Sequence, residues 1–196
     1  MTSPYDGLTP DLWEQKTHEL IALHPLNSNK IYSVCLNAWQ NIFQSQIGSK
    51  PFLIGRDIFP TPQIMGFLLH ELIPLELAFR YPQLWRKGTL ANEKDLIYIP
   101  NDDFSIEIKT SSSAKNIYGN RSYAQPSESK KGKSGYYLAI NFEKFVPNNP
   151  QPHISLIRFG WLDHEDWIGQ SAASGQQARL SPQVEKGKLL ILPLTK

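Results

Sequence analysis

In the first third of the chain, hydrophobic residues recur at the three- and four-residue intervals that are typical of amphipathic helices. This spacing predicts three helices, over residues 9–23, 31–43 and 61–75. The Thr-Pro pair at 9–10 is a good start for the first helix, because threonine suits the N-cap and proline the first turn. We expect Gly48 to end the second helix and Pro74 to kink or divide the third.

Beyond residue 90 the pattern changes to short hydrophobic runs bounded by turn-forming residues, which is typical of strands. Five strands are predicted, over residues 95–99, 105–110, 136–145, 154–161 and 189–194. The segment 52–58 fits a short strand or an extended link, and polar stretches at 111–135 and 163–183 separate the later strands. These elements favour an α/β fold in which a central mixed β-sheet is flanked by helices.

The length of the chain favours a single domain over residues 1–196, with a helical part over about 1–80 and a sheet over about 90–196. Hydrophobic residues make up 40% of the sequence, which is typical of a globular protein. No apolar run approaches the ~20 residues of a membrane span, and the N-terminus lacks the features of a signal peptide. The single cysteine, Cys35, excludes a disulfide within the chain, and we expect a buried thiol and a cytoplasmic location.

The chemistry of the chain is concentrated around two neighbouring predicted strands. Asp95 opens the first, and Glu107-Ile-Lys109 closes the second. Since side chains at i and i+2 share a face, Glu107 and Lys109 project together while Ile106 and Ile108 face the core. A carboxylate at the start of a buried strand needs a partner, and a divalent cation suits two carboxylates that lie close together. The pattern predicts metal-assisted phosphodiester hydrolysis, with a simple salt bridge between strands as the alternative.

In this interpretation the carboxylates of Asp95 and Glu107 and the carbonyl oxygen of Ile108 hold Mg²⁺. Lys109 lies beside the attacking water, where it orients the water and stabilises the transition state.

The strand register decides whether the two acids meet. A turn of four residues, 100–103, would place Asp95 opposite Ile108 and away from Glu107. A one-residue change in loop length, or a bulge near Asp102 and Asp103, would restore a common face. These two aspartates are themselves expected to form the turn.

A further catalytic acid is expected from the third helix. Glu71 is the first choice, ahead of Glu76, and His70 is a lesser candidate. The alternative is that both glutamates are exposed helical residues without a role in the site.

The net charge of +2 does not by itself indicate a nucleic-acid-binding protein, but the charge is unevenly distributed. The polar stretch after Lys109 is rich in cations, amides and hydroxyls, which match phosphates and base edges. It predicts a DNA-binding loop, against the alternative of a solvated loop. The predicted contacts are Ser112, Lys115, Asn116, Asn120, Arg121, Tyr123, Gln125, Lys130, Lys131 and Lys133.

Two other polar segments are weaker candidates. Asp163-His-Glu-Asp166 contains metal-ligand residue types, but consecutive residues rarely converge on one ion, so a strand end and a helix start capped by Asp163 are predicted. The segment 174–179 is a further candidate for DNA contacts.

Asp95 and Glu107-Ile-Lys109 resemble the core of the PD-(D/E)XK nuclease superfamily, although no proline precedes Asp95. Three stretches more specifically resemble type II restriction endonucleases of the ScaI type, within a region from about residue 62 to 179. They are Glu107-Ile-Lys-Thr-Ser-Ser, Ile117-Tyr-Gly-Asn-Arg-Ser-Tyr-Ala-Gln125 and Lys133-Ser-Gly-Tyr-Tyr-Leu-Ala-Ile-Asn-Phe142.

The resemblance implies a homodimer that uses Mg²⁺ to cut both strands of double-stranded DNA at a specific palindromic site. Each subunit would cut one strand, so that the two-fold axis of the protein matches that of the site. A restriction enzyme also needs a DNA methyltransferase that protects the same site. The acid-x-Lys core maps onto Asp95, Glu107 and Lys109.

Other functions are compatible with the same residues. Within nucleases, they would serve a repair, nicking, junction-resolving or modification-dependent enzyme, although the chain is too short for a separate methyl-reading domain. From other classes, the chain would be an inactive DNA-binding module or a structural α/β interaction protein. The intact set of Asp95, Glu107 and Lys109 argues against an inactive module.

Overall fold

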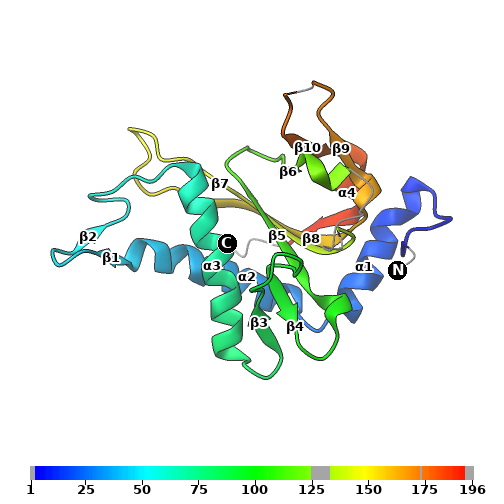
Figure 1. Cartoon of the computed structure of the whole chain (residues 1–196), viewed down its shortest axis with the longest axis horizontal. Coiled ribbons are helices and arrows are strands. Elements are labelled where there is room, and N and C mark those ends of the chain that lie inside the picture. Colours follow the sequence, from blue (N-terminus) through cyan, green and yellow to red (C-terminus); the bar gives the residue numbers. More distant parts are fainter. Residues whose placement is uncertain (1–2, 125–132, 173, 193–196) are drawn as a thin grey trace.

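A computed structural model describes residues 3–124, 133–172 and 174–192 (Figure 1). The first predicted helix begins as a 3-10 helix, η1 (Pro10–Leu12), and continues as α1 (Trp13–Leu23). The second is α2 (Ser28–Gln44), whose Asn27 cap accepts a hydrogen bond from the N–H of Lys30 at 2.9 Å.

Gly48 does not end α2, which stops at Gln44. Gly48 lies instead between β1 (Gln46–Ile47) and β2 (Phe52–Leu53), an antiparallel pair. Its φ of +84° is readily adopted by glycine, so the residue serves the turn of this hairpin and not the helix end.

The third helix, α3 (Pro62–Arg80), starts after Thr61 as predicted and continues through Pro74 as one element. The expected division of the helix is therefore wrong. Pro74 is buried together with Ile73 and Leu77 of the same helix, and this packing offsets the hydrogen bond that proline cannot donate.

The central sheet has six strands in the order β11-β8-β7-β5-β4-β3. Only β5 and β7 pair in parallel, so the predicted mixed sheet is confirmed. The strands are β3 (Trp85–Lys87), β4 (Leu96–Tyr98), β5 (Ile106–Ser111), β7 (Gly135–Phe142), β8 (Ile154–Leu162) and β11 (Leu189–Ile191). Strand β3 was not predicted, because a three-residue Trp-Arg-Lys segment has no alternating pattern long enough to detect.

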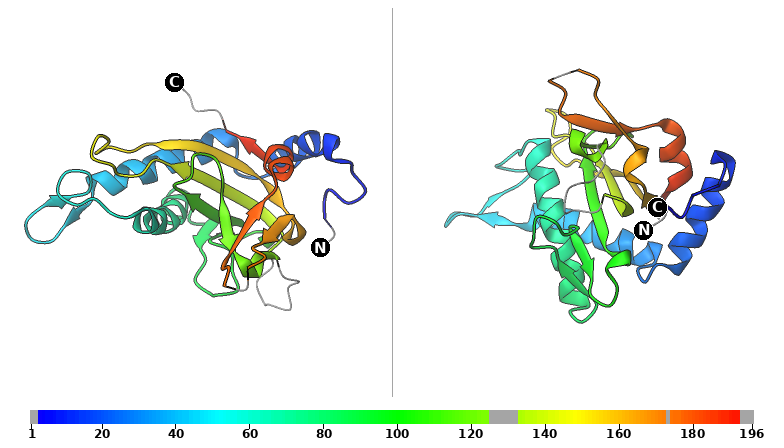
Figure 2. Two further views of the ribbon diagram at one scale, coloured as in Figure 1. Left: turned by 90° about the horizontal axis from the view of Figure 1, so that it is seen from above. Right: turned by 45° about the vertical axis from the view of Figure 1, so that its right-hand side comes forward.

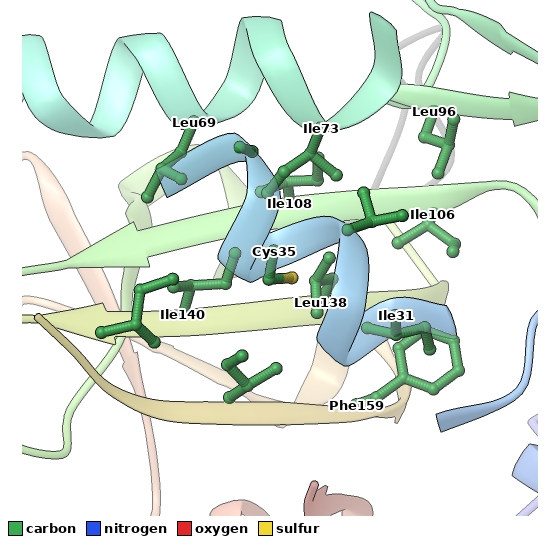
Figure 3. Close-up of a cluster of buried hydrophobic side chains, with 14 of the residues drawn as sticks. Ile31, Cys35, Leu69, Ile73, Leu96, Ile106, Ile108, Leu138, Ile140 and Phe159 are labelled. Atoms are coloured by element: carbon green, nitrogen blue, oxygen red, sulfur yellow. The ribbon is translucent and has the colours of Figure 1, made fainter. Parts of the chain in front are cut away.

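One face of this sheet packs against α2 and α3. Figure 3 shows Ile106 and Ile108 of β5 directed toward Leu69 and Ile73 of α3, with Cys35 of α2 among them. Cys35 is fully buried, as predicted for a core thiol.

The other face is covered by a second, small sheet and by α4 (Pro182–Lys188). The small sheet is antiparallel, in the order β6-β10-β9, and lies on the side of the molecule away from α3 (Figures 1 and 2). Its strands are β6 (Tyr118–Asn120), β9 (Trp167–Gly169) and β10 (Gln177–Leu180).

The small sheet corrects the expectation that residues 111–135 form one long polar loop. Each of its strands has only three or four residues, and Gly119 and Ala178 occupy buried positions where a larger hydrophobic residue would have revealed the alternation. None of the helices in the described part of the chain combines the length and hydrophobicity needed to cross a membrane.

Candidate active site

The alternation along β5 separates its core residues from its polar residues, as predicted. Ile106 and Ile108 are fully buried against the helices, while Glu107 and Lys109 project from the opposite face. The Nζ atom of Lys109 donates to Glu107 Oε1 at 2.7 Å and to the Ile108 carbonyl oxygen at 3.2 Å. The rigid strand therefore holds the ammonium group of Lys109 beside the oxygens of Glu107 and Ile108 that were predicted to bind a metal ion.

The strand register brings Asp95 to the same place. Leu96 of β4 pairs with Ile106 of β5, and the side chain of Asp95, directly before β4, reaches the backbone of β5, where its Oδ2 atom accepts a hydrogen bond from the N–H of Ile108. The positive charge of Lys109 acts on this carboxylate and on that of Glu107, so the two acids lie around one ammonium group.

The connection between the strands explains this register. Residues Asp102–Phe104 form a 3-10 helix, η2, in which Asp102 accepts a hydrogen bond from the hydroxyl of Ser105 at 2.6 Å. The N–H of Tyr98 donates to that same hydroxyl oxygen at 3.0 Å, where a regular ladder would use a backbone carbonyl. The connection therefore differs from the four-residue turn, and the aspartates form it as predicted.

Three groups stabilise the Asp95 carboxylate. Its Oδ2 atom accepts a hydrogen bond from the N–H of Ile108 at 2.7 Å and lies 3.5 Å from Nδ1 of His70. Burial alone would raise the pKa of Asp95, but the hydrogen bond from His70, the charge of Lys109 and the Ile108 amide outweigh it and lower the pKa to about 2. Asp95 is therefore ionised at neutral pH, as a metal ligand must be.

Glu107 is almost completely buried, with 3% of its surface exposed. Its Oε1 atom accepts hydrogen bonds from Lys109 and from the hydroxyl of Tyr123. Burial, followed by the negative charge of Glu107, raises the pKa of Tyr123, so the phenol stays protonated and remains a donor.

The oxygens gathered here fit a hard divalent cation. Two carboxylates and one carbonyl oxygen match Mg²⁺, which is usually held by one or two carboxylates and keeps several waters. Within the described residues, no three histidine, cysteine, aspartate or glutamate side chains are grouped so that they could hold one ion. Asp95 and Glu107 are thus the candidate ligands, and Glu71 does not join them in a group of three.

The structure gives the predicted helical acids other partners. The carboxylate of Glu71 forms an ion pair with Lys87 of β3, and Glu76 pairs with Arg80 one turn along α3, with an N–O distance of 2.5 Å. The residue that α3 presents to Asp95 is His70, which the sequence analysis ranked below the two glutamates. No local signal separates a structural histidine from one beside an active site.

The chain is similar to known restriction enzymes over nearly its whole length. Residues 3–193 match the family described as ScaI restriction endonuclease. The chain is also 46% identical over 193 residues to a protein of Streptomyces caespitosus, "Type II restriction enzyme ScaI", and the match covers 97% of this chain and 84% of that enzyme. The chain belongs to the ScaI restriction endonuclease family. The resemblance found in the sequence is confirmed, and the family match includes the whole carboxylate site.

Several residues predicted to contact DNA in this ScaI family member have partners within the protein. Tyr123, 9% exposed, donates to Glu107, and Lys133, equally buried, donates to the Ser122 carbonyl oxygen. The guanidinium of Arg121 donates to the carbonyl oxygens of Ala172 and Gly175, at 3.2 and 3.3 Å. Tertiary packing gives these side chains partners within the protein that charge and polarity alone did not indicate.

Other predicted contacts lie at the surface. Lys115, Asn116 and Asn120 are exposed, and Ser112 is half-buried. The backbone beneath them is fixed, because Arg158 donates to the Lys115 carbonyl oxygen at 2.5 Å and Asn141 donates to that of Asn116 at 3.0 Å. Three further predictions, Gln125, Lys130 and Lys131, fall outside the described residues.

The small sheet brings together polar residues from two separate candidate segments of the sequence. Its exposed positions share one face, because Gln177 pairs with Asn120, and Arg179 pairs with both Tyr118 and Ile168. We call these five residues the outer face. Four of them, Tyr118, Ile168, Gln177 and Arg179, line a hollow of about 820 Å³ together with residues 169–172, 174 and 175. Asn120 was a predicted DNA contact, and Gln177 and Arg179 lay in the candidate segment 174–179. The strands that bring them together were not predicted, and the alternation Gln-Ala-Arg-Leu in β10 was the available signal.

The segment Asp163–Asp166 behaves as predicted. It is the end of β8 followed by a 3-10 helix, η4 (His164–Asp166), with Asp163 as its cap. Asp166 is buried and forms an ion pair with Lys188, with an N–O distance of 2.7 Å, so it fastens α4 to this corner of the ScaI family fold.

Proposed function

We propose that this ScaI family member is a type II restriction endonuclease that hydrolyses phosphodiester bonds in double-stranded DNA at a specific palindromic site, with Mg²⁺ as its cofactor. The observation that carries the proposal is the gathering of Asp95, Glu107 and Lys109 at β5, where Lys109 donates to Glu107 and the N–H of Ile108 donates to Asp95. The proposed nuclease is a single domain over residues 1–196.

Each residue of the cluster has a distinct role in the proposed reaction. Asp95, Glu107 and the Ile108 carbonyl would hold the ion, which would activate the attacking water and offset charge that develops on the phosphate. Lys109 orients the water and adds positive charge beside the reacting phosphate. The N–H of Ile108 and the ring of His70 keep the Asp95 carboxylate ionised and oriented.

We place DNA along the outer face of the small sheet and the neighbouring loop. A two-stranded β-ribbon fits the major groove, and amide and guanidinium groups read base edges there. Asn120, Gln177 and Arg179 supply such groups, and Lys115 supplies a phosphate contact. This surface adjoins the cluster because Tyr123, which follows β6, contacts Glu107.

A palindromic site implies a homodimer, since each subunit then cuts one strand. A methyltransferase that modifies the same sequence would protect the DNA of the host, and it need not bind the nuclease.

The test is incubation of the purified protein and of Lys109→Ala with phage-length DNA, in Mg²⁺ or in EDTA. We expect discrete Mg²⁺-dependent bands from the wild-type protein and a ~100- to 1000-fold lower cleavage rate from Lys109→Ala. Binding of Lys109→Ala to a duplex carrying the mapped site should be retained, because Lys109 acts on the water. Lys16→Ala, which removes a half-exposed cation from α1, is the matched control.

Other outcomes would select among the alternatives. A smear would indicate a nonspecific or structure-directed nuclease. Intact DNA that is still retarded in a binding gel would favour an inactive DNA-binding module. Normal cleavage by Lys109→Ala would contradict the role given to this lysine.

A further inference from the structure

Tyr123 stands between the proposed DNA surface and the catalytic carboxylate. It belongs to a 3-10 helix, η3 (Arg121–Ala124), that directly follows β6. Its hydroxyl donates to Oε1 of Glu107, the same oxygen that receives the hydrogen bond from Lys109. The Nζ atom of Lys109 also lies 4.7 Å from the centre of the Tyr123 ring, so one phenol contacts both catalytic side chains.

The back of the small sheet presses on the same ring. The ring centroids of Tyr123 and Trp167, a residue of β9, are 5.3 Å apart. A Cβ atom on Gly119 of β6 would lie 3.2 Å from both rings, so a glycine at this position allows the strand to approach them. Outer-face residues and Tyr123 are therefore separated by the thickness of a single strand layer.

Hydrogen bonds also join the helix η3 to the loop that precedes β10. The N–H of Arg121 donates to the Gln176 carbonyl oxygen at 2.7 Å, and its guanidinium donates to the carbonyls of Ala172 and Gly175. The helix that carries Tyr123 is thereby joined to the segment that lines the hollow beside Gln177 and Arg179. A displacement of the outer face would be transmitted to Tyr123 through these bonds.

We propose that Tyr123 is a positioning residue that couples recognition of the DNA sequence to the geometry of Glu107 and Lys109. The inference rests on the proposed function. Two donors that converge on one carboxylate oxygen fix the orientation of Glu107, and a ligating carboxylate held in this way binds its metal more tightly. When DNA of the correct sequence binds to the outer face, the small sheet fixes the position of η3. The Tyr123 hydroxyl of η3 then fixes the orientation of the Glu107 carboxylate.

The test uses Tyr123→Phe, which removes the hydroxyl but keeps the ring between Trp167 and Lys109. Mn²⁺ replaces Mg²⁺ as a spectroscopic probe, and its binding to the full-length protein on a duplex with the mapped site is followed by electron paramagnetic resonance. We expect Mn²⁺ affinity and the single-turnover cleavage rate each to fall by ~10- to 100-fold. The affinity for the duplex itself should change by less than about twofold, because the hydroxyl does not face DNA.

Tyr136→Phe is the matched control. The Tyr136 hydroxyl donates to the Leu20 carbonyl oxygen at 3.1 Å on the helical side of the central sheet. The substitution therefore removes a comparable hydrogen bond at a position away from the site. This variant should cleave and bind Mn²⁺ like the wild-type protein. Equal losses in the two variants would mean that Tyr123→Phe acts only through stability, and would overturn the proposal.

Coupling is measured by comparing the mapped site with a site altered at one base pair. Tyr123→Phe should slow cleavage of the mapped site more than cleavage of the altered one. The ratio of the two cleavage rates, mapped over altered, should therefore decrease. An equal slowing at both sites would overturn the coupling. Unchanged Mn²⁺ affinity and cleavage in Tyr123→Phe would overturn the positioning role, whereas a wild-type protein that cuts no DNA would overturn the proposed function instead.

Discussion

The carboxylates of Asp95 and Glu107 are held by different means, and this difference predicts how each responds to substitution. Glu107 is buried and fixed by two side-chain donors, whereas Asp95 accepts its shortest hydrogen bond from the backbone N–H of Ile108. A carboxamide can also accept that N–H, so an asparagine at position 95 would preserve the local geometry while removing the charge.

We therefore expect Asp95→Asn to fold normally and to lose catalysis. Its cleavage rate should fall by ~100- to 1000-fold, since a neutral oxygen is a poor ligand for a hard cation and offsets no charge. Single-turnover cleavage of the mapped site and a thermal unfolding curve measure the two effects. Asp103→Asn, an exposed aspartate in η2, is the matched control. Cleavage by Asp95→Asn within a few-fold of the wild-type rate would exclude Asp95 as a metal ligand.

At the scale of elements, close backbone contacts determine how the sheets and helices meet. Gly160 of β8 pairs with Leu189 of β11, at the point where α4 leads into the last strand. A Cβ atom at Gly160 would lie 1.9 Å from the carbonyl oxygen of Lys188, which belongs to the backbone and cannot rotate away. The attachment of α4 and β11 to the central sheet thus requires a glycine here.

Gly160→Ala should lower the free energy of unfolding by about 1–3 kcal/mol, because the two strands must separate to accept the methyl group. Urea denaturation monitored by tryptophan fluorescence measures the change. The control is Gly169→Ala, where the added Cβ would meet its nearest atom at 3.4 Å, an ordinary contact. If both variants are equally stable, β11 is not held at β8 in the way described.

For the molecule as a whole, the described residues contain one cluster with the proposed catalytic composition. Hydrolysis of both DNA strands then requires either two subunits or two successive binding events. The proposed homodimer makes the two cuts concerted, and this difference can be measured on supercoiled plasmid DNA.

We expect a mixed dimer of wild-type and Lys109→Ala subunits to convert supercoiled plasmid into open circles that persist. Only one strand is cut, because the variant subunit lacks the group that orients water. The mixed dimer is obtained with two affinity tags, and the products are resolved on an agarose gel. Linear product formed as fast as by the wild-type dimer would show that one subunit can cut both strands.

The sequence predicted the fold and the candidate site to different extents. Strong periodic patterns predicted α2, α3 and the long central strands, because each of them buries a continuous apolar face. Strands β3, β6, β9 and β10 escaped prediction, because three or four residues carry too little periodicity and are stabilised by pairing with distant segments.

The alternation of β5 follows from the amino-acid sequence alone, and with it the placement of Glu107 and Lys109 on one face and of Ile106 and Ile108 in the core. That result follows from local geometry, since a strand has a fixed two-residue period. The sequence also carried enough family character for the relationship to ScaI-type enzymes to be seen in three short stretches.

Contacts between residues of different helices and strands, in contrast, depend on the tertiary structure. The approach of Asp95 to β5 depended on a connection whose hydrogen bonds run through the side chain of Ser105. The burial of Tyr123 against Glu107 depended on the folding of a small sheet onto the central one. Contacts of this kind join residues distant in sequence, and no local pattern encodes them because their energy is gained only when the separate elements pack.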